Sequence, residues 1–391
     1  MVSSSTKWIR TLVRAGKMQQ RSAKKLVKSL LAPLVVKPVA KPRGKPERRS
    51  KPAAPPSPFK TRVTLNKRPR SKAASSDVLP GKWLASYHAA APELGGLAAR
   101  RISYWLYLPH RPPSAAVQQR GLPLIVMLHG CEQSATQFAQ GTRMNRLAEQ
   151  KGYAVLYPQQ SLRSHARRCW KWYEKMTQEG GGDARLIVGL IEQVAARYAI
   201  DPTRIYLAGI SAGAGMANII ALRHPELIAA LGLHSGPMFG GGHNMIGALG
   251  VMQHGASSRV DRAIDEVLAA RPGFPGMPTI LIQGDSDKVV RPINQTQLMR
   301  QSILLNRMPK ETEVSVEIMP PGAPGSRNPA RGCQLRDFHV DGKLMLRVAK
   351  IEHLEHAWSG GDASLAFHAK AGPDASKMML EFFARHQRRR A

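Results

Sequence analysis

The sequence predicts an α/β fold, in which a mostly parallel central sheet carries helices on both faces, preceded by a basic N-terminal extension. Three observations predict this arrangement. From about residue 82 onward, short apolar runs of strand type alternate with stretches of helical spacing. The first 75 residues instead hold 21 lysines and arginines but only one acid, Glu47. Finally, a serine flanked by glycines lies where a predicted strand passes into a predicted helix.

The extension carries a formal charge of +20 out of the +32 of the whole chain. Within residues 1–36, apolar and basic side chains recur near helical spacing, which predicts an interfacial amphipathic helix or a solvated arm. Residues 37–81 are rich in Pro, Lys, Arg and Ser and are predicted to be a disordered linker. The charge of residues 7–72 predicts an anionic partner, a granule or membrane surface. Because the linker has few aromatic side chains, no specific nucleic-acid partner is expected.

Several functional classes are disfavoured by simple counts. The three cysteines, Cys131, Cys169 and Cys333, are too few for a disulfide scaffold and lack the spacing of a zinc site. No apolar run reaches the roughly 18 residues that a membrane-spanning helix needs. The apolar run 30–36 is short and is broken by Pro33, so the N-terminus does not match a secretory signal. We therefore expect neither a metal nor an organic cofactor, and we expect no simple export.

The predicted catalytic domain occupies residues 82–391. Strands are expected near 101–108, 123–128, 153–157, 205–208, 228–233, 278–283, 313–319 and 345–352. Helices are expected near 135–150, 184–198, 212–223, 292–306 and 374–386. The segment 238–276, rich in Gly, Met and Pro, is a long insertion between strands. Long loops at the carboxyl edge of such a sheet are where substrate pockets are built.

Residues 209–213 form a G-x-S-x-G element at a strand-to-helix junction. A sharp turn there would hold Ser211 in a strained backbone conformation, and the flanking glycines would let strand and helix approach closely. The amino end of the following helix offers free N–H groups to a developing oxyanion. We therefore interpret Ser211 as a nucleophile rather than as part of an inert turn.

A nucleophilic serine needs a base and an orienting carboxylate, expected in the order acid, then histidine, from loops at the same sheet edge. The strand near 278–283 is followed by two candidates, Asp285 and Asp287, of which Asp287 is favoured and Asp285 is held in reserve. The strand near 345–352 is followed by His353 and His356. We favour His356 as the base and expect His353 to be the last residue of the strand.

The oxyanion hole should combine the N–H that follows the nucleophile with one from the loop after an early strand. The first of these belongs to Ala212. The strand ending at Leu128 continues into His129-Gly130-Cys131, which makes the Cys131 N–H the natural second donor.

These residues resemble a known family. The segments Leu128-His-Gly-Cys131, Cys169-Trp-Lys-Trp172, Gly209-Ile-Ser-Ala-Gly213 and His356-Ala-Trp-Ser-Gly-Gly361 are similar to those of the polyhydroxybutyrate (PHB) depolymerase family of esterases. That family belongs to the α/β-hydrolases, and feruloyl and acetylxylan esterases are among its relatives. The resemblance covers roughly residues 98–386.

The resemblance implies Ser211 as nucleophile, Asp287 as acid and His356 as base, acting through an acyl-enzyme. It also implies that Cys131 and Cys169 pair, although in a reducing compartment they would be free thiols. Export is usual in the family, so extracellular and cytoplasmic locations, the latter on a granule or membrane surface, are both retained as expectations.

The sequence thus predicts a serine esterase of hydroxyalkanoate polymers or oligomers. Because no separate substrate-binding module follows the last predicted helix, a feruloyl, acetylxylan or generic short-acyl esterase is an equal alternative. A further alternative is an anionic-surface-binding protein with a vestigial hydrolase domain, and a peptidase of the same fold is another. Four aromatic side chains are candidates for an apolar wall around the substrate: Trp170, Trp172, Tyr173 and Trp358.

Overall fold

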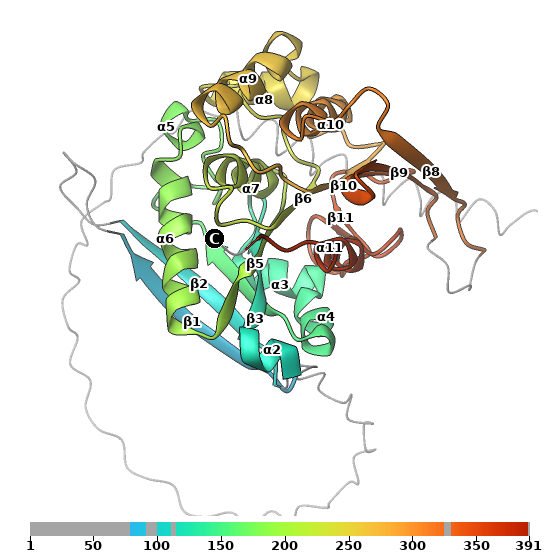
Figure 1. Ribbon diagram of the computed structural model, residues 1–391. Coiled ribbons are helices and arrows are strands. Elements are labelled where there is room, and N and C mark those ends of the chain that lie inside the picture. The colour runs from blue at the N-terminus through green and yellow to red at the C-terminus, as the bar shows by residue number, and fades with distance from the viewer. Residues whose placement is uncertain (1–78, 91–99, 111–114, 324–329, 390–391) are drawn as a thin grey trace, which may run out of the picture. The chain divides into compact units, whose positions relative to one another are not determined.

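The computed structural model describes residues 79–90, 100–110, 115–323 and 330–389. The predicted arm and nearly all of the predicted linker lie outside these residues. The described chain folds around a ten-stranded sheet with the strand order β1-β2-β4-β3-β5-β6-β7-β10-β9-β8 (Figure 1). The strands are β1 (Lys82–Ala89), β2 (Arg101–Leu108), β3 (Leu122–Leu128), β4 (Ala154–Gln159), β5 (Ile200–Ile210), β6 (Ala230–His234), β7 (Thr279–Gly284), β8 (Glu313–Met319), β9 (Cys333–Val340) and β10 (Lys343–Ile351).

The six central strands, β4-β3-β5-β6-β7-β10, run parallel, whereas β1 and β2 at one edge and β9 and β8 at the other pair antiparallel. The prediction of a mostly parallel sheet is therefore confirmed. Strands β1 and β9 were not among those predicted. Both belong to the antiparallel pairs beside the parallel strands and therefore lie outside the strand–helix alternation that predicted the others.

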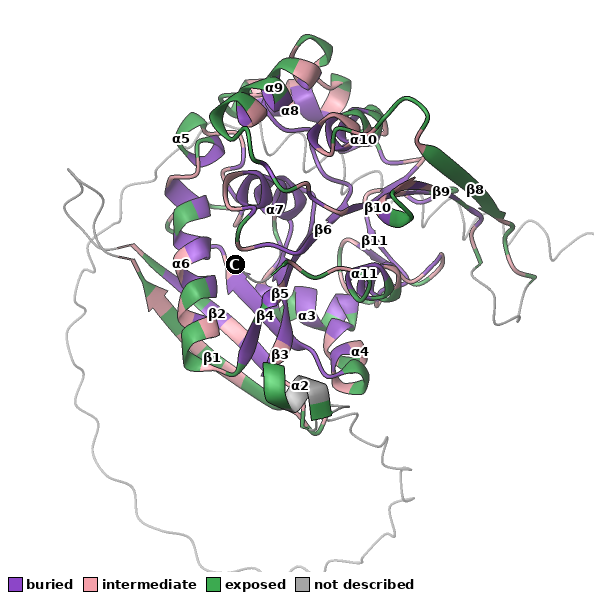
Figure 2. Ribbon diagram, in the orientation of Figure 1, coloured by how far each residue is buried: buried purple, intermediate pink, exposed green. Residues whose placement is uncertain are grey.

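Helices cover both faces of the sheet, and each face has its own hydrophobic cluster (Figures 1 and 2). One cluster includes α6 (Gly182–Arg197), α7 (Ala212–Arg223) and α10 (Ile293–Leu305). The other includes α3 (Ala135–Thr142), α4 (Met144–Lys151) and α11 (Ala375–Phe383). Strands β3, β4, β6 and β7 are buried along almost all of their length, as expected for strands covered on two faces. Two further helices are short, α2 (Ala115–Arg120) and α5 (Lys175–Gln178).

The helix predicted over 135–150 is two helices, which corrects that prediction. The chain turns at Arg143, whose φ of 55° lies in the left-handed region. From there the Arg143 guanidinium reaches the carbonyl oxygens of Gly360 and Gly361, the second at 2.9 Å. Tertiary contacts to a distant loop therefore outweigh the continuous helical pattern.

The predicted insertion 238–276 contains α8 (Met245–His254), the 3₁₀ turn η1 (Ser257–Arg259) and α9 (Val260–Ala270). Amide side chains of α10 hold it by bonding to its backbone. Gln301 Nε2 donates to the Phe239 carbonyl at 2.8 Å, and Asn294 Nδ2 donates to the Met252 carbonyl at 3.0 Å. Because these amides are buried, their hydrogen bonds fix the insertion against α10.

Candidate active site

Ser211 lies directly after β5, at the amino end of α7. Its φ of 56° and ψ of −124° are strained for a residue with a side chain, and its N–H donates to the His234 carbonyl at 3.0 Å. The two neighbouring glycines are required by space. A Cβ on Gly209 would lie 2.5 Å from the Gly213 carbonyl carbon, and a Cβ on Gly213 would lie 2.1 Å from the Leu128 oxygen. The local sequence therefore forces the serine onto a tight turn at the carboxyl edge of the sheet.

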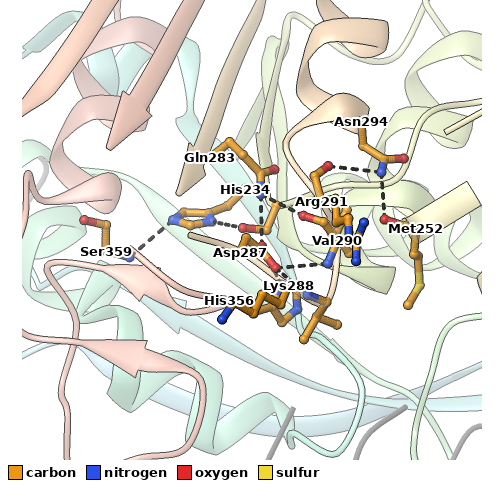
Figure 3. Close-up of polar contacts among 12 residues, drawn as sticks. His234, Met252, Gln283, Asp287, Lys288, Val290, Arg291, Asn294, His356 and Ser359 are labelled. Carbon is orange, nitrogen blue, oxygen red and sulfur yellow. Dashed lines mark hydrogen bonds and ion pairs between the residues drawn. The ribbon is translucent and has the colours of Figure 1, made fainter. Parts of the chain in front are cut away.

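Asp287, in the loop after β7, is buried and fully bonded (Figure 3). Its Oδ1 accepts the N–H groups of Val289 and Val290 at 2.9 and 3.0 Å, and its Oδ2 accepts from Gln283 Nε2 at 2.9 Å. Oδ2 is also 2.8 Å from Nδ1 of His356. Burial by itself would raise the pKa of Asp287, but the charge and hydrogen bond of His356, together with the two amides, outweigh it and hold the pKa below its usual range.

His356 lies beside this carboxylate. Its side chain is only 7% exposed. When Nδ1 donates to the Asp287 carboxylate, the neutral ring has no proton on Nε2, which is then available as a base. Ser211 and His356 line the same pocket. That pocket is lined by Gly130, Cys131, Gln133, Ile210, Ser211, His356 and Phe367.

The two less favoured candidates, Asp285 and His353, bond to each other and not to Asp287 or His356. Asp285 Oδ1 accepts the His353 N–H at 2.8 Å and the Ser286 hydroxyl at 2.9 Å. His353 is exposed, with a φ of 54°, and stands two residues beyond Ile351, where β10 ends. The expectation that His353 is the last strand residue is therefore wrong, because the chain has already turned there. Asp285 fixes that turn and does not bond the histidine beside Ser211.

The loop after β3 is held from several sides. His129 is fully buried, donates from Nδ1 to the Gly130 carbonyl at 2.7 Å and accepts the Gln160 N–H on Nε2 at 3.1 Å. Burial lowers the pKa of His129 to about 4, so the ring stays neutral and keeps both bonds. The Gly130 N–H in turn donates to Gln133 Oε1 at 2.8 Å. Within the described part of the chain, the N–H group of Cys131 has no acceptor.

The N–H of Ala212, at the first position of α7, likewise has no acceptor among the described residues. The loop that carries Cys131 is tied to a second loop by a disulfide to Cys169, with the two Cα atoms 4.3 Å apart. Next to this link, Trp170 Nε1 donates to the His129 carbonyl at 3.0 Å. The remaining cysteine, Cys333, is buried and free, and burial raises the pKa of its thiol to about 12.

Comparison with known proteins identifies the family of this chain. The profile of the family described as esterase PHB depolymerase matches residues 102–315, which is more than half of the chain. The chain belongs to the PHB depolymerase family of esterases.

Individual relatives match over shorter stretches. A poly(3-hydroxyalkanoate) depolymerase C from Paucimonas lemoignei is 31% identical over 182 residues, which are 46% of this chain and 44% of that protein. Feruloyl esterase B from Neurospora crassa is 35% identical over 115 residues, which are 29% of this chain and 38% of that protein. The matches thus span less than half the length of either relative.

A solved structure shows the fold. The acetyl xylan esterase from Aspergillus awamori aligns with a TM-score of 0.53 at 18% identity, over 72% of this chain and 94% of that one. This PHB depolymerase family member therefore has the α/β-hydrolase fold, as the sequence predicts.

The three tryptophans of the predicted aromatic wall do not line the pocket in this member of the family. Trp170, Trp172 and Trp358 are at most 5% exposed and belong to the hydrophobic core, and none lines the pocket beside Ser211. Trp358 stacks on the ring of His234 and donates from Nε1 to Ser376. For Trp170 and Trp358, burial satisfies the large apolar ring and one acceptor satisfies the indole N–H.

Three residues of the site escaped the sequence analysis: His234, Phe367 and Arg143. His234 ends β6 and accepts the Ser359 N–H on Nε2 at 3.2 Å, which ties β6 to the loop of His356 (Figure 3). Phe367 lines the pocket with a φ of 62°. A histidine that ends an apolar strand was a visible signal, whereas Phe367 and Arg143 lie in no motif.

Two classes of site are not seen in the described ranges. No group of three or more His, Cys, Asp or Glu side chains there could hold a metal ion. No helix within those ranges has the length and apolar character needed to cross a membrane.

Proposed function

We propose that this chain is a serine hydrolase of carboxylic esters, with Ser211 as nucleophile, His356 as general base and Asp287 as its orienting acid. One observation carries the proposal. His356 is bonded to a buried, ionised Asp287 on one side and shares a pocket with a strained Ser211 on the other. Three loops distant in sequence supply these groups at one sheet edge, as this chemistry requires.

The steps follow from the proton positions. Ser211 Oγ attacks the ester carbonyl carbon while Nε2 of His356 takes the hydroxyl proton. The carbonyl oxygen becomes an oxyanion, which accepts from the N–H groups of Cys131 and Ala212. His356 then gives its proton to the leaving alcohol, and an acyl-enzyme remains. Water, deprotonated by His356, releases the acid and restores Ser211. Asp287 stays ionised throughout and stabilises the imidazolium that forms twice per turnover.

The proposed substrates are hydroxyalkanoate polymers or oligomers. The name of the Paucimonas lemoignei relative supports this class. Feruloyl and acetylxylan esters are the second candidate, supported by the names of fungal relatives that match over shorter stretches. The discriminating measurement is kcat/KM on hydroxybutyrate oligomers, polymer film, feruloyl sugars and acetylated xylan. Turnover of feruloyl or acetyl esters without any release from hydroxybutyrate oligomers would remove the first class.

The assignment of Ser211 is tested by Ser211→Ala. We expect a folded protein whose kcat on a p-nitrophenyl short-acyl ester falls by about 10⁶, because no other group forms the acyl-enzyme. The matched control is Ser286→Ala, whose hydroxyl bonds Asp285 and lies outside the pocket. That control should retain turnover. Activity retained by Ser211→Ala would remove the serine mechanism.

Ester specificity is tested separately, with ester and amide substrates that share one acyl group. Hydrolysis of the ester alone supports the proposal. Comparable kcat/KM values on the amide would instead favour a peptidase of the same fold.

We further propose that the basic residues 7–72 bind an anionic granule or membrane surface, on the strength of their charge alone. A variant lacking residues 1–76 should keep its kinetics on soluble esters but lose sedimentation with anionic vesicles or granules. Unchanged sedimentation would refute this role. If the full chain sedimented but had no esterase activity, the alternative of a vestigial hydrolase would be favoured.

A further inference from the structure

Strand β8, at one outer edge of the ten-stranded sheet, is exposed on both faces (Figure 2). Val314, Val316 and Ile318 alternate along it, so their side chains share one face. They are 45%, 56% and 70% exposed, and Ile318 is among the most exposed large apolar residues of the described chain. Apolar strand residues of this kind are normally half-buried, so their exposure marks β8 as a candidate contact surface.

The outer backbone edge of β8 has no pairing strand within the described ranges of the chain. β9 pairs with one side of the strand in an unbroken register, and no strand among the described residues pairs with the other. Edge strands are usually blunted by charged side chains, especially lysine, by proline or by a bulge. The seven residues of β8 contain neither lysine nor proline, their pairing with β9 has no bulge, and their only charged residues are Glu313 and Glu317. The free edge can therefore accept a further strand.

We propose that this strand is β8 of a second copy, paired antiparallel about a two-fold axis at Val316. Val316 then lies opposite its own equivalent, and Val314 lies opposite Ile318 of the second copy. The six apolar side chains form one continuous ridge, and the two sheets join into one. Such a contact is isologous, with the same patch on both copies, and is therefore closed.

The charged residues exclude the two neighbouring registers. With the axis at Val316, Glu317 faces Ser315 of the second copy and Glu313 faces Met319, so no carboxylate lies directly opposite another. An axis at Ser315 would place Glu313 opposite Glu317, and an axis at Glu317 would place that residue opposite itself. Like charges directly opposite each other destabilise a strand pair. The pattern Glu-Val-Ser-Val-Glu-Ile-Met is thus self-complementary in one of these three registers.

A single strand pair buries less than the roughly 1,600 Å² of a standard interface, so the dimer is expected to be reversible, with a dissociation constant in the micromolar range. The two Glu317 side chains are diagonal neighbours across the pair, and their repulsion is screened by salt. Dimerisation should therefore strengthen as the NaCl concentration rises.

Sedimentation velocity of the full chain over a protein concentration series tests the proposal. The wild type should pass from monomer to dimer. Val316→Lys, which places two ammonium groups opposite each other, should weaken dimerisation at least about tenfold. Ser315→Lys makes a similar charge change on the other face of the strand, where it meets Glu317 of the second copy. That variant should keep or tighten the dimer.

A wild type that is monomeric at every concentration would overturn the proposal. So would a dimer that Val316→Lys leaves unchanged or that Ser315→Lys breaks. Both variants should retain the wild-type rate on a soluble ester and the wild-type circular dichroism spectrum, which shows that they are folded. The test is independent of the proposed reaction, because the association state is measured without substrate.

Hydrogen exchange identifies what covers the strand. If a second copy does so, protection of the β8 amides rises with protein concentration in the wild type and not in Val316→Lys. Protection already complete in the monomer would assign the edge to another segment of the same chain and would overturn the proposal.

Discussion

At the scale of single residues, Phe367 has an unusual backbone conformation. A bulky side chain at a φ of 62° is a strained arrangement, and such residues cluster where a site requires them. Its ring meets that of His356 edge-on, with the centroids 6.4 Å apart, and lines the pocket beside Ser211. In the proposed mechanism His356 hands its proton to the leaving alcohol. We therefore propose that Phe367 lies on the alcohol side of the scissile bond.

We predict that Phe367→Ala allows the enzyme to accept bulkier alcohol groups without changing its preference among acyl groups. The kcat/KM for esters of bulky alcohols should rise by about tenfold relative to methyl esters, because the removed ring had excluded them. The ranking of acyl groups in a fixed alcohol series should stay the same. The measurement is a matrix of esters in which acyl and alcohol vary independently.

The control for this prediction is Leu365→Ala, two residues away and outside the pocket lining. It should preserve both rankings. A Phe367→Ala enzyme that changes the acyl ranking alone would show that the ring faces the other half of the substrate.

At the scale of elements, the disulfide between Cys131 and Cys169 clamps the proposed oxyanion donor to the loop of Trp170. The bond closes a separation of 38 residues, for which loss of chain entropy in the unfolded state corresponds to roughly 4 kcal/mol. Hydrogen bonds from His129 and Gln133 position the same turn without a covalent link. The clamp therefore contributes to stability and also limits the movement of one N–H group.

We predict that Cys169→Ser lowers kcat by up to about 10²–10³ while KM changes little, because an oxyanion donor acts mainly on the transition state. The free energy of unfolding should fall by up to about 4 kcal/mol. Steady-state kinetics and urea denaturation measure the two effects. Cys333→Ala is the control, because that thiol is free and remote from the pocket lining, and it should retain kcat. Undiminished kcat in a verified Cys169→Ser protein would show that the hydrogen bonds alone hold the donor.

At the scale of the whole molecule, buried neutral histidines make stability depend on pH. Burial lowers the pKa of His129 to about 4. Burial, together with the charge of His356, lowers that of His234 to about 3. The usual value in an unfolded chain is 6.5. Below pH 6.5 the unfolded chain therefore binds protons that the folded chain does not, which favours unfolding.

We predict that the free energy of unfolding falls as the pH is lowered from about 6.5 towards about 4, by up to about 1.4 kcal/mol per pH unit for each histidine. Urea denaturation at a series of pH values measures the slope. His234→Gln removes one titrating group, so the free energy of unfolding of this variant should depend less steeply on pH, by the contribution of His234. Its free energy of unfolding at pH 7 should also be lower. A variant slope equal to that of the wild type would show that His234 is protonated alike in both states.

The local sequence predicts much of the central sheet and the turn that carries Ser211. The apolar runs of the parallel strands are buried on both faces, so periodicity and length identify them without tertiary information. The turn at Ser211 is also predicted by local sequence, because glycine is the only residue type that fits at positions 209 and 213. The order of serine, acid and histidine along the chain then nominated Asp287 and His356, although it left Asp285 and His353 as alternatives.

The sequence by itself thus determined the α/β sheet, the serine turn and a short set of partners for the serine. Only the tertiary structure decided which carboxylate bonds His356, that the three tryptophans belong to the core, and that Arg143 interrupts a helix to hold the loop of His356. The physical reason is the distance along the sequence between the residues that interact. Strand and turn signals arise from neighbours a few residues apart, whereas these contacts join segments that the chain brings together only after the sheet has formed.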